Sequence, residues 1–251
     1  MTAPVDTTWL LTREAEDAVA EAEVLTRHGL KWASVPCIEC VTRPWPTWPH
    51  REGTPVLFLT SRRAAAALPH GQEWRRSGPK ALIASTAPGT KEWLEAHGHH
   101  VDVSATGGAE GLARALALEW QARGQPEWHL RYPTSDAGLQ APEQANAVAI
   151  LKTLGPVDRA VVYETKPPAG LEERLEPHLS RPYGLSFSSP SAVKAFFAAV
   201  RRGVRAPERV VCFGGSTART WDVGRPEGWP PAELAELSAV DTIVHPKEKT
   251  P

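Results

Sequence analysis

The sequence predicts an α/β protein with two similar lobes, each built on a mainly parallel sheet. A divergent internal repeat is the first observation, because residues 56–68 (VLFLTSRRAAAAL) recur in pattern as residues 185–197 (LSFSSPSAVKAFF). The second is that short apolar runs alternate with Ala-rich helical stretches, which is typical of βαβ units. The third is length, since 251 residues allow two compact domains with their own cores. Two copies of one unit predict two lobes and a cleft for a ligand.

The neighbours of the repeated segment recur in the same order. Residues 81–86 (ALIAST) stand to the first half as residues 210–217 (VVCFGGST) stand to the second. Residues 9–13 (WLLTR) and 128–132 (WHLRY) both precede a helical stretch. This alignment pairs Val56 with Leu185 and Trp9 with Trp128.

In the first half, a strand at residues 9–11 leads into a helix that Thr12 is expected to cap. Its acidic first turn suits the positive end of the helix dipole, and Gly29 suits its C-terminus. Residues 31–41 are expected to be extended, and the alternating prolines of residues 44–49 forbid regular structure. Strands at 56–59, 81–84 and 100–103 then alternate with helices after Ser61, at 90–97 and at 112–123.

The second half repeats this order with looser spacing. Strands are expected near residues 129–132, 160–163, 185–187 and 210–213, with helices at about 142–154, 171–179 and 192–200 and another after residue 217. Pro230 and Pro231 would start a last helix at residues 232–237, because proline is favoured in the first turn. The tail from residue 241 is expected to be mobile.

Composition excludes several classes of function. The formal net charge is −1 and no dense Lys/Arg block occurs, so nucleic acid is not expected as a partner. No apolar run approaches the roughly 20 residues that cross a bilayer, and the N-terminus lacks a signal-peptide pattern. A cytoplasmic location without membrane attachment is therefore expected. The G-x-G-x-x-G, Walker A, H-E-x-x-H and G-x-S-x-G motifs are absent.

Two clusters could suggest a metal or redox site, and a structural role is favoured for both. Cys37 and Cys40 form a C-x-x-C, but no second pair completes four zinc ligands, and residues three apart in a strand face opposite sides. His97, His99 and His100 surround a glycine after a helix, where histidine complements the negative end of the helix dipole. No metal and no cofactor are predicted.

Hydroxyl or glycine residues follow most of the predicted strands. The turns are Thr60-Ser61, Ser85-Thr86, Thr106-Gly107-Gly108, Ser188-Ser189-Ser191 and Gly214-Gly215-Ser216-Thr217. In open parallel sheets such turns lie at the carboxyl ends of the strands, where helix N-termini offer N–H donors to anions. Together they predict a receptor for a polyanion. The alternative for any single turn is a helix N-cap, worth about 1 kcal/mol.

Five short motifs in the right order resemble the uroporphyrinogen-III synthase family over nearly the whole chain. They are residues 11–13 (LTR), 58–61 (FLTS), 161–165 (VVYET), 187–193 (FSSPSAV) and 213–218 (FGGSTA). The resemblance implies two flavodoxin- or Rossmann-like α/β lobes that exchange segments and are joined by a two-stranded linker. It would place residues 1–35 and 168–245 in the first lobe, 42–160 in the second, 36–41 and 161–167 in the linker strands, and 246–251 in a mobile tail.

The same resemblance implies a function. The family is a cyclising hydro-lyase of tetrapyrrole (haem, sirohaem and cobalamin) biosynthesis. It closes linear hydroxymethylbilane to uroporphyrinogen III, with loss of water and inversion of ring D, and uses no metal or organic cofactor. Eight carboxylates on the substrate match a polyanion receptor made of backbone amides. Because two lobes in one chain make a monomer sufficient, a monomer is expected, with transient hand-over of hydroxymethylbilane from hydroxymethylbilane synthase.

The family's catalytic tyrosine matches Tyr163, which would hydrogen-bond the departing hydroxyl, since a phenol of pKa near 10 stays protonated at neutral pH. The alternative is that Tyr163 only packs at the end of an apolar strand. Substrate-binding residues implied by the turns and the resemblance are Thr12, Arg13, Ser61, Arg62, Ser85, Thr86, Ser188, Ser189, Ser191, Gly214, Gly215, Ser216 and Thr217.

Two segments depart from the family pattern. Residues 83–85 (IAS) lack the glycine that commonly precedes the helix, and residues 131–135 (RYPTS) are an unusual opening for the second repeat. These departures leave open a second hypothesis, a non-catalytic two-lobe paralogue that binds a polycarboxylate or tetrapyrrole, or regulates. A nucleotide-using α/β enzyme is a third, which the missing phosphate fingerprint disfavours.

Overall fold

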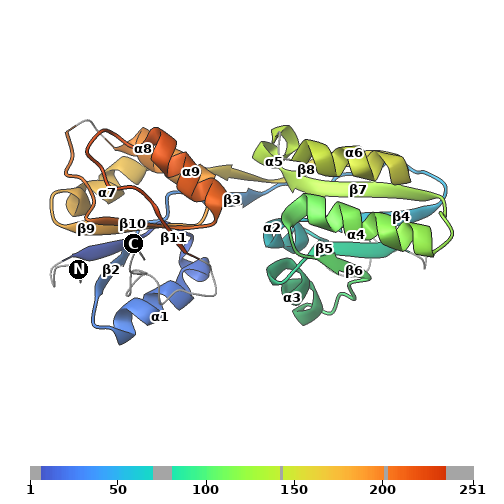
Figure 1. The fold of residues 1–251 in the computed structure, drawn as a ribbon, viewed down its shortest axis with the longest axis horizontal. Helices are drawn as coiled ribbons and strands as arrows, with labels where there is room; N and C mark the ends of the chain where they lie inside the picture. The colour runs from blue at the N-terminus through green and yellow to red at the C-terminus, as the bar shows by residue number, and fades with distance from the viewer. Residues whose placement is uncertain (1–6, 70–80, 142–143, 201–202, 236–251) are drawn as a thin grey trace, which may run out of the picture. The chain divides into compact units, whose positions relative to one another are not determined.

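The computed structural model describes residues 7–69, 81–141, 144–200 and 203–235. The chain divides into two compact units (Figure 1). Unit 1 comprises Met1–Glu39 and Lys166–Pro251, and unit 2 comprises Cys40–Thr165. The chain therefore passes from one unit to the other twice, and unit 2 is continuous in sequence while unit 1 is not.

Unit 1 contains a five-stranded parallel sheet covered on both faces. Its strands are β1 (Thr8–Leu11), β2 (Lys31–Ser34), β9 (Tyr183–Phe187), β10 (Arg209–Phe213) and β11 (Glu233–Ala235), in the order β11-β10-β9-β1-β2. Helices α7 (Leu171–Leu179), α8 (Pro190–Ala199) and α9 (Gly215–Gly224) pack on one face, and α1 (Val19–Arg27) packs on the other. The first two strands thus complete a sheet whose other strands come from the C-terminal third of the chain.

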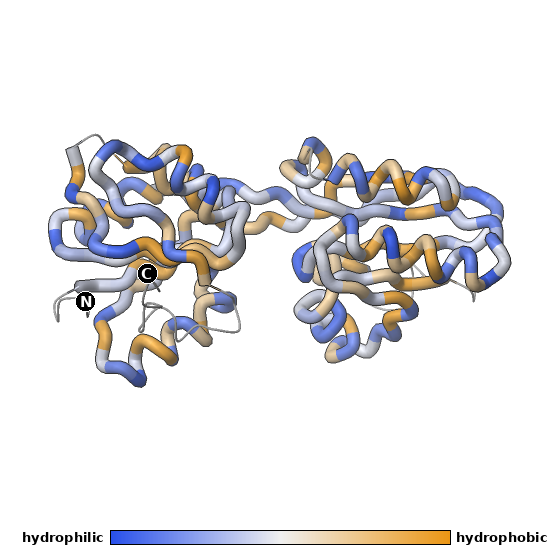
Figure 2. Tube along the Cα trace, in the orientation of Figure 1, coloured by the Kyte–Doolittle hydropathy of each residue, from blue (hydrophilic) through white to orange (hydrophobic). Residues whose placement is uncertain are grey.

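Unit 2 contains a six-stranded sheet. Its strands are β3 (Glu39–Thr42), β4 (Thr54–Leu59), β5 (Leu82–Thr86), β6 (Val103–Ala105), β7 (Trp128–Ser135) and β8 (Val157–Lys166), in the order β3-β8-β7-β4-β5-β6. Helices α4 (Gly108–Ala122) and α6 (Ala145–Leu154) pack on one face, α2 (Arg62–Ala66) and α3 (Gly89–Ala96) on the other, and α5 (Asp136–Gln140) follows β7. In both units the helices contain both hydrophobic and hydrophilic residues (Figure 2), as expected for helices that pack one face on a sheet.

The strands β3 and β8 carry the chain between the units. They are neighbours in the sheet, and Lys166 and Glu39 form an ion pair of 3.2 Å between them. Arg43, just after β3, pairs with Glu164 of β8, and its backbone N–H donates to the Val162 carbonyl at 2.8 Å. The two crossings are therefore held together by backbone and ionic contacts.

The two units have the same internal plan, as the repeat predicts. Ser61 and Ser189 occupy equivalent N-caps, with φ/ψ of −147°/148° and −148°/148°. Each hydroxyl accepts a hydrogen bond from the N–H three residues later, at 3.1 Å from Ala64 and 3.2 Å from Ala192. With these caps aligned, β4 to β8 correspond in order to β9, β10, β11, β1 and β2. The predicted fold class, with its exchanged segments, is confirmed.

The repeat alignment drawn from the sequence was wrong by one residue. Aligning the cap serines makes Leu57, not Val56, equivalent to Leu185, and both pack beneath the helices that their strands lead into. Val56 faces the opposite side, towards α4 and α6. Because these parallel strands are apolar on both faces, no alternation of polar and apolar residues determines their register, and a shift of one residue turns every side chain over.

The register also separates the two tryptophans. Leu57 pairs with Arg131 and Leu185 with Leu10, so the equivalent of Trp9 is Leu130 and not Trp128. Both tryptophans are buried, with exposures of 0% and 1%. Each repeat therefore begins near a tryptophan, but the two tryptophans do not occupy equivalent positions in the sheets.

Thr12 does not cap a helix, contrary to expectation. It is fully buried, and its hydroxyl donates to the Ser186 carbonyl at 2.5 Å. A 3-10 turn at Ala15–Asp17, with Glu14 in its N-cap position, comes before α1. The Thr12 hydroxyl therefore bonds to the partner strand β9 instead of capping a local helix.

Other boundaries differ from the sequence prediction. Pro230 and Pro231 do not start a helix, since Glu233–Ala235 is strand β11, which pairs with β10. The segment 31–41 is divided into β2 and β3, α4 begins at Gly108 instead of residue 112, and β6 begins at Val103, the last residue of the expected strand at 100–103. The tail at 241–251, the end of the helix expected at 232–237 and the start of the helix expected at 142–154 lie outside the described residues. Residues 44–49 form neither helix nor strand, as their prolines predict.

Among the described residues, no helix is long and apolar enough to cross a membrane.

We expect Gly184→Ala to destabilise the protein by about 1–3 kcal/mol, because overpacking a core has that cost. Gly184 pairs with Trp9 in the sheet, and an added Cβ would lie 2.9 Å from the Trp9 ring. Urea denaturation followed by tryptophan fluorescence measures the change.

Gly215→Ala is the matched control in the same unit, because a Cβ there meets nothing within 4 Å. It should leave the free energy of unfolding unchanged or slightly higher. Equal stabilities of the two variants would contradict the close packing of Trp9 on β9.

Candidate functional site

The predicted turns gather at the carboxyl edges of the two sheets. In unit 2 the turns after β4, β5 and β6 share one edge, and in unit 1 the turns after β1, β9 and β10 share another. The strand order reverses between β4 and β7, and between β9 and β1. Ligands of open α/β sheets bind outside the carboxyl ends of strands at such a reversal.

Tyr163 and Ser61 meet at the edge of unit 2. The half-buried Tyr163, from β8, places its hydroxyl 3.1 Å from Ser61 Oγ, although β7 separates β8 from β4 in the sheet. Ser61 Oγ also accepts from the Ala64 N–H of α2. The helix cap thus fixes the serine, and the serine holds the phenol hydroxyl at the edge.

A second tyrosine hydroxyl lies nearby, and the sequence reasoning missed it. Tyr132 OH donates to Gln144 Oε1 at 2.9 Å and lies 3.4 Å from Thr60 Oγ1. The Arg159 guanidinium lies 5.3 Å from the Tyr132 ring centroid, and its Nη2 donates to Gln144 Oε1 at 3.0 Å. Burial raises the pKa of Tyr132 above its usual value, so this phenol stays protonated.

Beside this network is a cavity of about 380 Å³. Its lining residues are Thr60, Gly107, Gly108, Ala109, Glu110 and Gln144. It includes the first turn of the fifteen-residue helix α4, whose N–H groups have no partner within the helix. Arg114 and Asn146 donate hydrogen bonds to the Glu110 carboxylate and lower its pKa, so this acidic side chain is bonded to two neighbouring side chains.

The turn after β5 is less accessible than predicted. Ser85 is fully buried, and its hydroxyl has no hydrogen-bond partner among the described residues. The strand register makes it equivalent to the buried Cys212 of unit 1, so it faces the core. Thr86 donates to Thr90 Oγ1 at 3.1 Å. Counting five residues on from Ser85 and from Cys212 makes Thr90 equivalent to Thr217, and both residues are buried. The sequence alignment did not identify Thr90.

In unit 1 the predicted residues differ in accessibility. Gly214, Gly215 and Ser216 are exposed at the start of α9, and the φ of 103° at Gly214 requires a glycine there. Thr217 is buried, and its hydroxyl lies 3.5 Å from the Phe213 carbonyl. The exposed first turn of α9 suits an anionic ligand.

The remaining predicted residues lie at the same edges. Ser188 is half-buried after β9, Ser189 caps α8, and Ser191 lies half-buried in the first turn of α8. Arg62 is exposed at the first position of α2. Arg13 pairs with Glu21 at 2.9 Å, and Thr12 has its hydroxyl bonded inside the sheet. The hydroxyls of Thr12 and Ser85 therefore point into the protein rather than to the edge.

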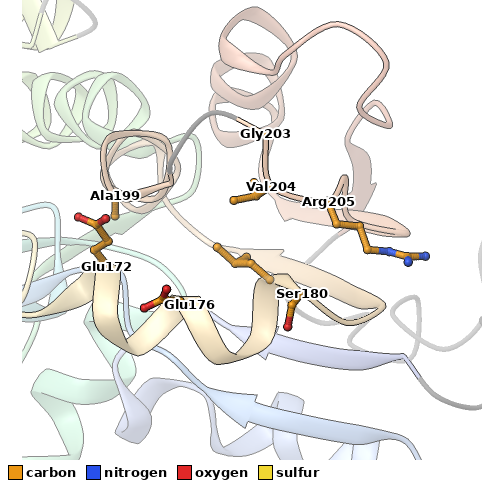
Figure 3. Close-up of a pocket in the computed structure, with 8 residues that line it drawn as sticks. Glu172, Glu176, Ser180, Ala199, Gly203, Val204 and Arg205 are labelled. Atoms are coloured by element: carbon orange, nitrogen blue, oxygen red, sulfur yellow. The ribbon is translucent and has the colours of Figure 1, made fainter.

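Unit 1 has a cavity of about 300 Å³ between α7 and the segment after α8 (Figure 3). The Glu172 and Glu176 carboxylates point into it, while Arg205 points away. Arg205 pairs with Glu208 at 2.6 Å. A space bordered by two carboxylates repels a polyanion, so this cavity does not suit the predicted ligand.

The described residues contain no group of three or more side chains that could hold a metal ion. His97 ends α3, and its ring stacks on Trp93 with centroids 3.8 Å apart. Burial raises the pKa of Cys37 to about 12, which keeps this thiol protonated and unreactive.

An α/β fold of this kind serves many functions, so its comparison with known families is informative. Residues 19–227 match the family described as "Uroporphyrinogen-III synthase HemD". The chain belongs to the uroporphyrinogen-III synthase family. This match spans both units, and it includes Tyr163 and all the predicted edge turns except Thr12 and Arg13. The comparison with curated proteins finds no significant match.

Three solved structures of uroporphyrinogen III synthase match most of this chain, and the first of them supports the fold. A selenomethionine variant of uroporphyrinogen III synthase from the bacterium Thermus thermophilus is 13% identical with a TM-score of 0.58, covering 94% of this chain and 95% of that one. The wild-type enzyme from this bacterium is 15% identical with a TM-score of 0.41, covering 95% of both chains. A further Thermus thermophilus structure is 13% identical with a TM-score of 0.38, covering 93% and 95%.

We expect Ser61 and Tyr163 to be energetically coupled. Ser61→Ala should lower the free energy of unfolding by about 1 kcal/mol through the lost helix cap. In a double-mutant cycle with Tyr163→Phe, the coupling should be about 0.5–1.5 kcal/mol, the usual contribution of one hydrogen bond. Chemical denaturation of the four proteins measures it.

Ser189→Ala removes the equivalent cap of α8 and should cost a similar amount, which calibrates the cap alone. A coupling energy indistinguishable from zero would show that the two hydroxyls do not bond in solution.

Proposed function

We propose that this chain is an active uroporphyrinogen-III synthase that cyclises hydroxymethylbilane to uroporphyrinogen III. The single observation that supports this most is the Tyr163 hydroxyl, held 3.1 Å from the capping Ser61 at the edge of a sheet that also bears an anion-accepting helix start. Membership of the family supports the reaction type, and the local geometry supports Tyr163 as the group that acts.

In the proposed reaction, Tyr163 hydrogen-bonds the hydroxyl of the terminal hydroxymethyl group. The C–O bond breaks, and the oxygen leaves as water with a proton, which produces an azafulvenium-like cation. The substituted carbon of ring D attacks this centre to form a spiro intermediate, whose rearrangement inverts the ring. Loss of one proton from the cyclised product balances the proton that left with water.

The carboxylates of the substrate would bind the turns that the structure leaves accessible. These are the first turns of α4 and α9, the capped turn at Ser61 and the half-buried serines that precede and begin α8. Helix N-termini bind carboxylates without making the protein basic, which agrees with a net charge of −1. The main contribution of such a site is orientation, because only one folded form of the linear substrate gives the type III product.

Freshly prepared hydroxymethylbilane should give mainly type III product with the protein and type I product without it. Separation of the two isomers by chromatography after oxidation measures this outcome. Only type I product at saturating protein would refute the proposed activity, and binding of an octacarboxylate without turnover would support the non-catalytic hypothesis.

Tyr163→Phe should lower kcat at least tenfold, equivalent to about 1.4 kcal/mol of barrier or more. The matched control is Tyr183→Phe, which removes a buried phenol hydroxyl that donates to the Arg205 carbonyl at 2.6 Å, at the opposite end of β9 from the turns. This control should reduce stability and leave kcat nearly unchanged. A smaller than tenfold loss for Tyr163→Phe would make Tyr163 a minor contributor.

A further inference from the structure

A buried carboxylate lies at the edge of unit 1, and the proposed function does not use it. Glu21, in the first turn of α1, is 1% exposed. A buried carboxylate is costly unless charge and hydrogen bonds compensate it. Its partners therefore show what holds it there.

Glu21 is bonded by two residues from other elements. Ser186 Oγ, in β9, donates to Glu21 Oε2 at 2.5 Å, and Arg13 Nη1, after β1, donates to Oε1 at 2.9 Å. Thr12 Oγ1 in turn donates to the Ser186 carbonyl at 2.5 Å. The carboxylate is thus fixed where β1 and β9 end side by side, at the reversal of strand order.

Unit 2 has aromatic side chains where unit 1 has this carboxylate and its partners. The equivalent of Ser186 is Phe58, and the equivalent of Leu11 is Tyr132, by the aligned registers of the two sheets. Phe58 and Tyr132 pack edge to face there, with ring centroids 4.9 Å apart. Since two aromatic rings fill this position in one repeat and a carboxylate with its partners fills it in the other, the carboxylate belongs to unit 1 and not to the shared plan of the two units.

Arg13 is the most exposed member of this arrangement. Its side chain keeps 12% exposure, at the same edge as Ser188 and the start of α9. A guanidinium has five N–H donors, and Glu21 takes one of them through Nη1. The planar fork of the remaining donors matches a carboxylate with two parallel hydrogen bonds, provided that the guanidinium is held in one orientation.

We propose that Glu21 is a positioning residue, which fixes the Arg13 guanidinium so that its other donors bind one carboxylate of the substrate. The identification of that carboxylate as part of hydroxymethylbilane rests on the proposed function. Ser186 and Thr12 complete the support by fixing the carboxylate against β9.

The test is calorimetry with uroporphyrin I, an octacarboxylate that does not turn over, on the full-length protein. Glu21→Gln keeps the shape and removes the charge, so it should weaken binding at least fivefold. Arg13→Ala should weaken it tenfold or more, and the double variant should bind no more weakly than Arg13→Ala alone. Additive losses, or an unchanged Kd for Glu21→Gln, would overturn the proposal, as would wild-type protein that does not bind uroporphyrin I.

Glu208→Gln is the matched control, because it makes the same change in the Arg205–Glu208 ion pair, which lies before β10 and away from the turns at the carboxyl edge. It should leave Kd within twofold of the wild-type value. Should Glu21→Gln fail to fold, Arg13→Lys replaces it. This variant keeps the charge and loses the fork, so a Kd within twofold of wild type would refute the proposed two-bond contact.

Turnover separates this proposal from the proposed function. With hydroxymethylbilane, Glu21→Gln should raise KM with little change in kcat, the pattern of lost uniform binding. Wild-type protein that binds uroporphyrin I but yields only type I product would refute the activity and leave the Arg13 site intact. Wild-type activity with unchanged Kd and KM in Glu21→Gln would do the reverse.

Discussion

The parallel pairing of β1 with β9 is the contact on which unit 1 depends. It joins strands from the two ends of the chain, with Trp9 packed against Gly184 and Thr12 bonded to the Ser186 carbonyl. All of unit 2 is contained in the loop between these strands. The entropy cost of closing a loop grows only slowly with its length, so such an insertion is tolerated once the strands bury their side chains. The same pairing positions Arg13, Glu21 and Ser186 at one edge.

The sequence predicted the class of fold because the repeat preserves the turns. The capping serines, Ser61 and Ser189, have the same backbone geometry, and the apolar runs before them are strands. The strand register could not be predicted from the sequence, because strands buried on both faces have no polar side to align. For this reason Trp9 and Trp128 were aligned although they are not equivalent. Strand β11 was also missed, because its pairing with β10 outweighs a local pattern of prolines and alanines that favours a helix.

The site was predicted in outline and less well in detail. A serine or threonine after a strand has the same appearance in sequence whether it caps a helix, as Ser61 does, or is buried without a hydrogen-bond partner among the described residues, as Ser85 is. The roles of Tyr132 and Glu21 depend on side chains from neighbouring strands and helices, and spacing along the chain carries no information about such contacts. Thr90 becomes visible only when the structural register replaces the sequence alignment.

Because of the exchange of segments, the ribosome completes the two units at different times during synthesis. Unit 2 is one continuous stretch of chain, whereas β1 must wait for β9, about 170 residues later. At about 5–20 residues per second this delay lasts on the order of ten seconds or more. Throughout that time Trp9 and Leu11 have no neighbouring strand from the C-terminal third, so an apolar strand lacks its native partner until most of the chain has been made.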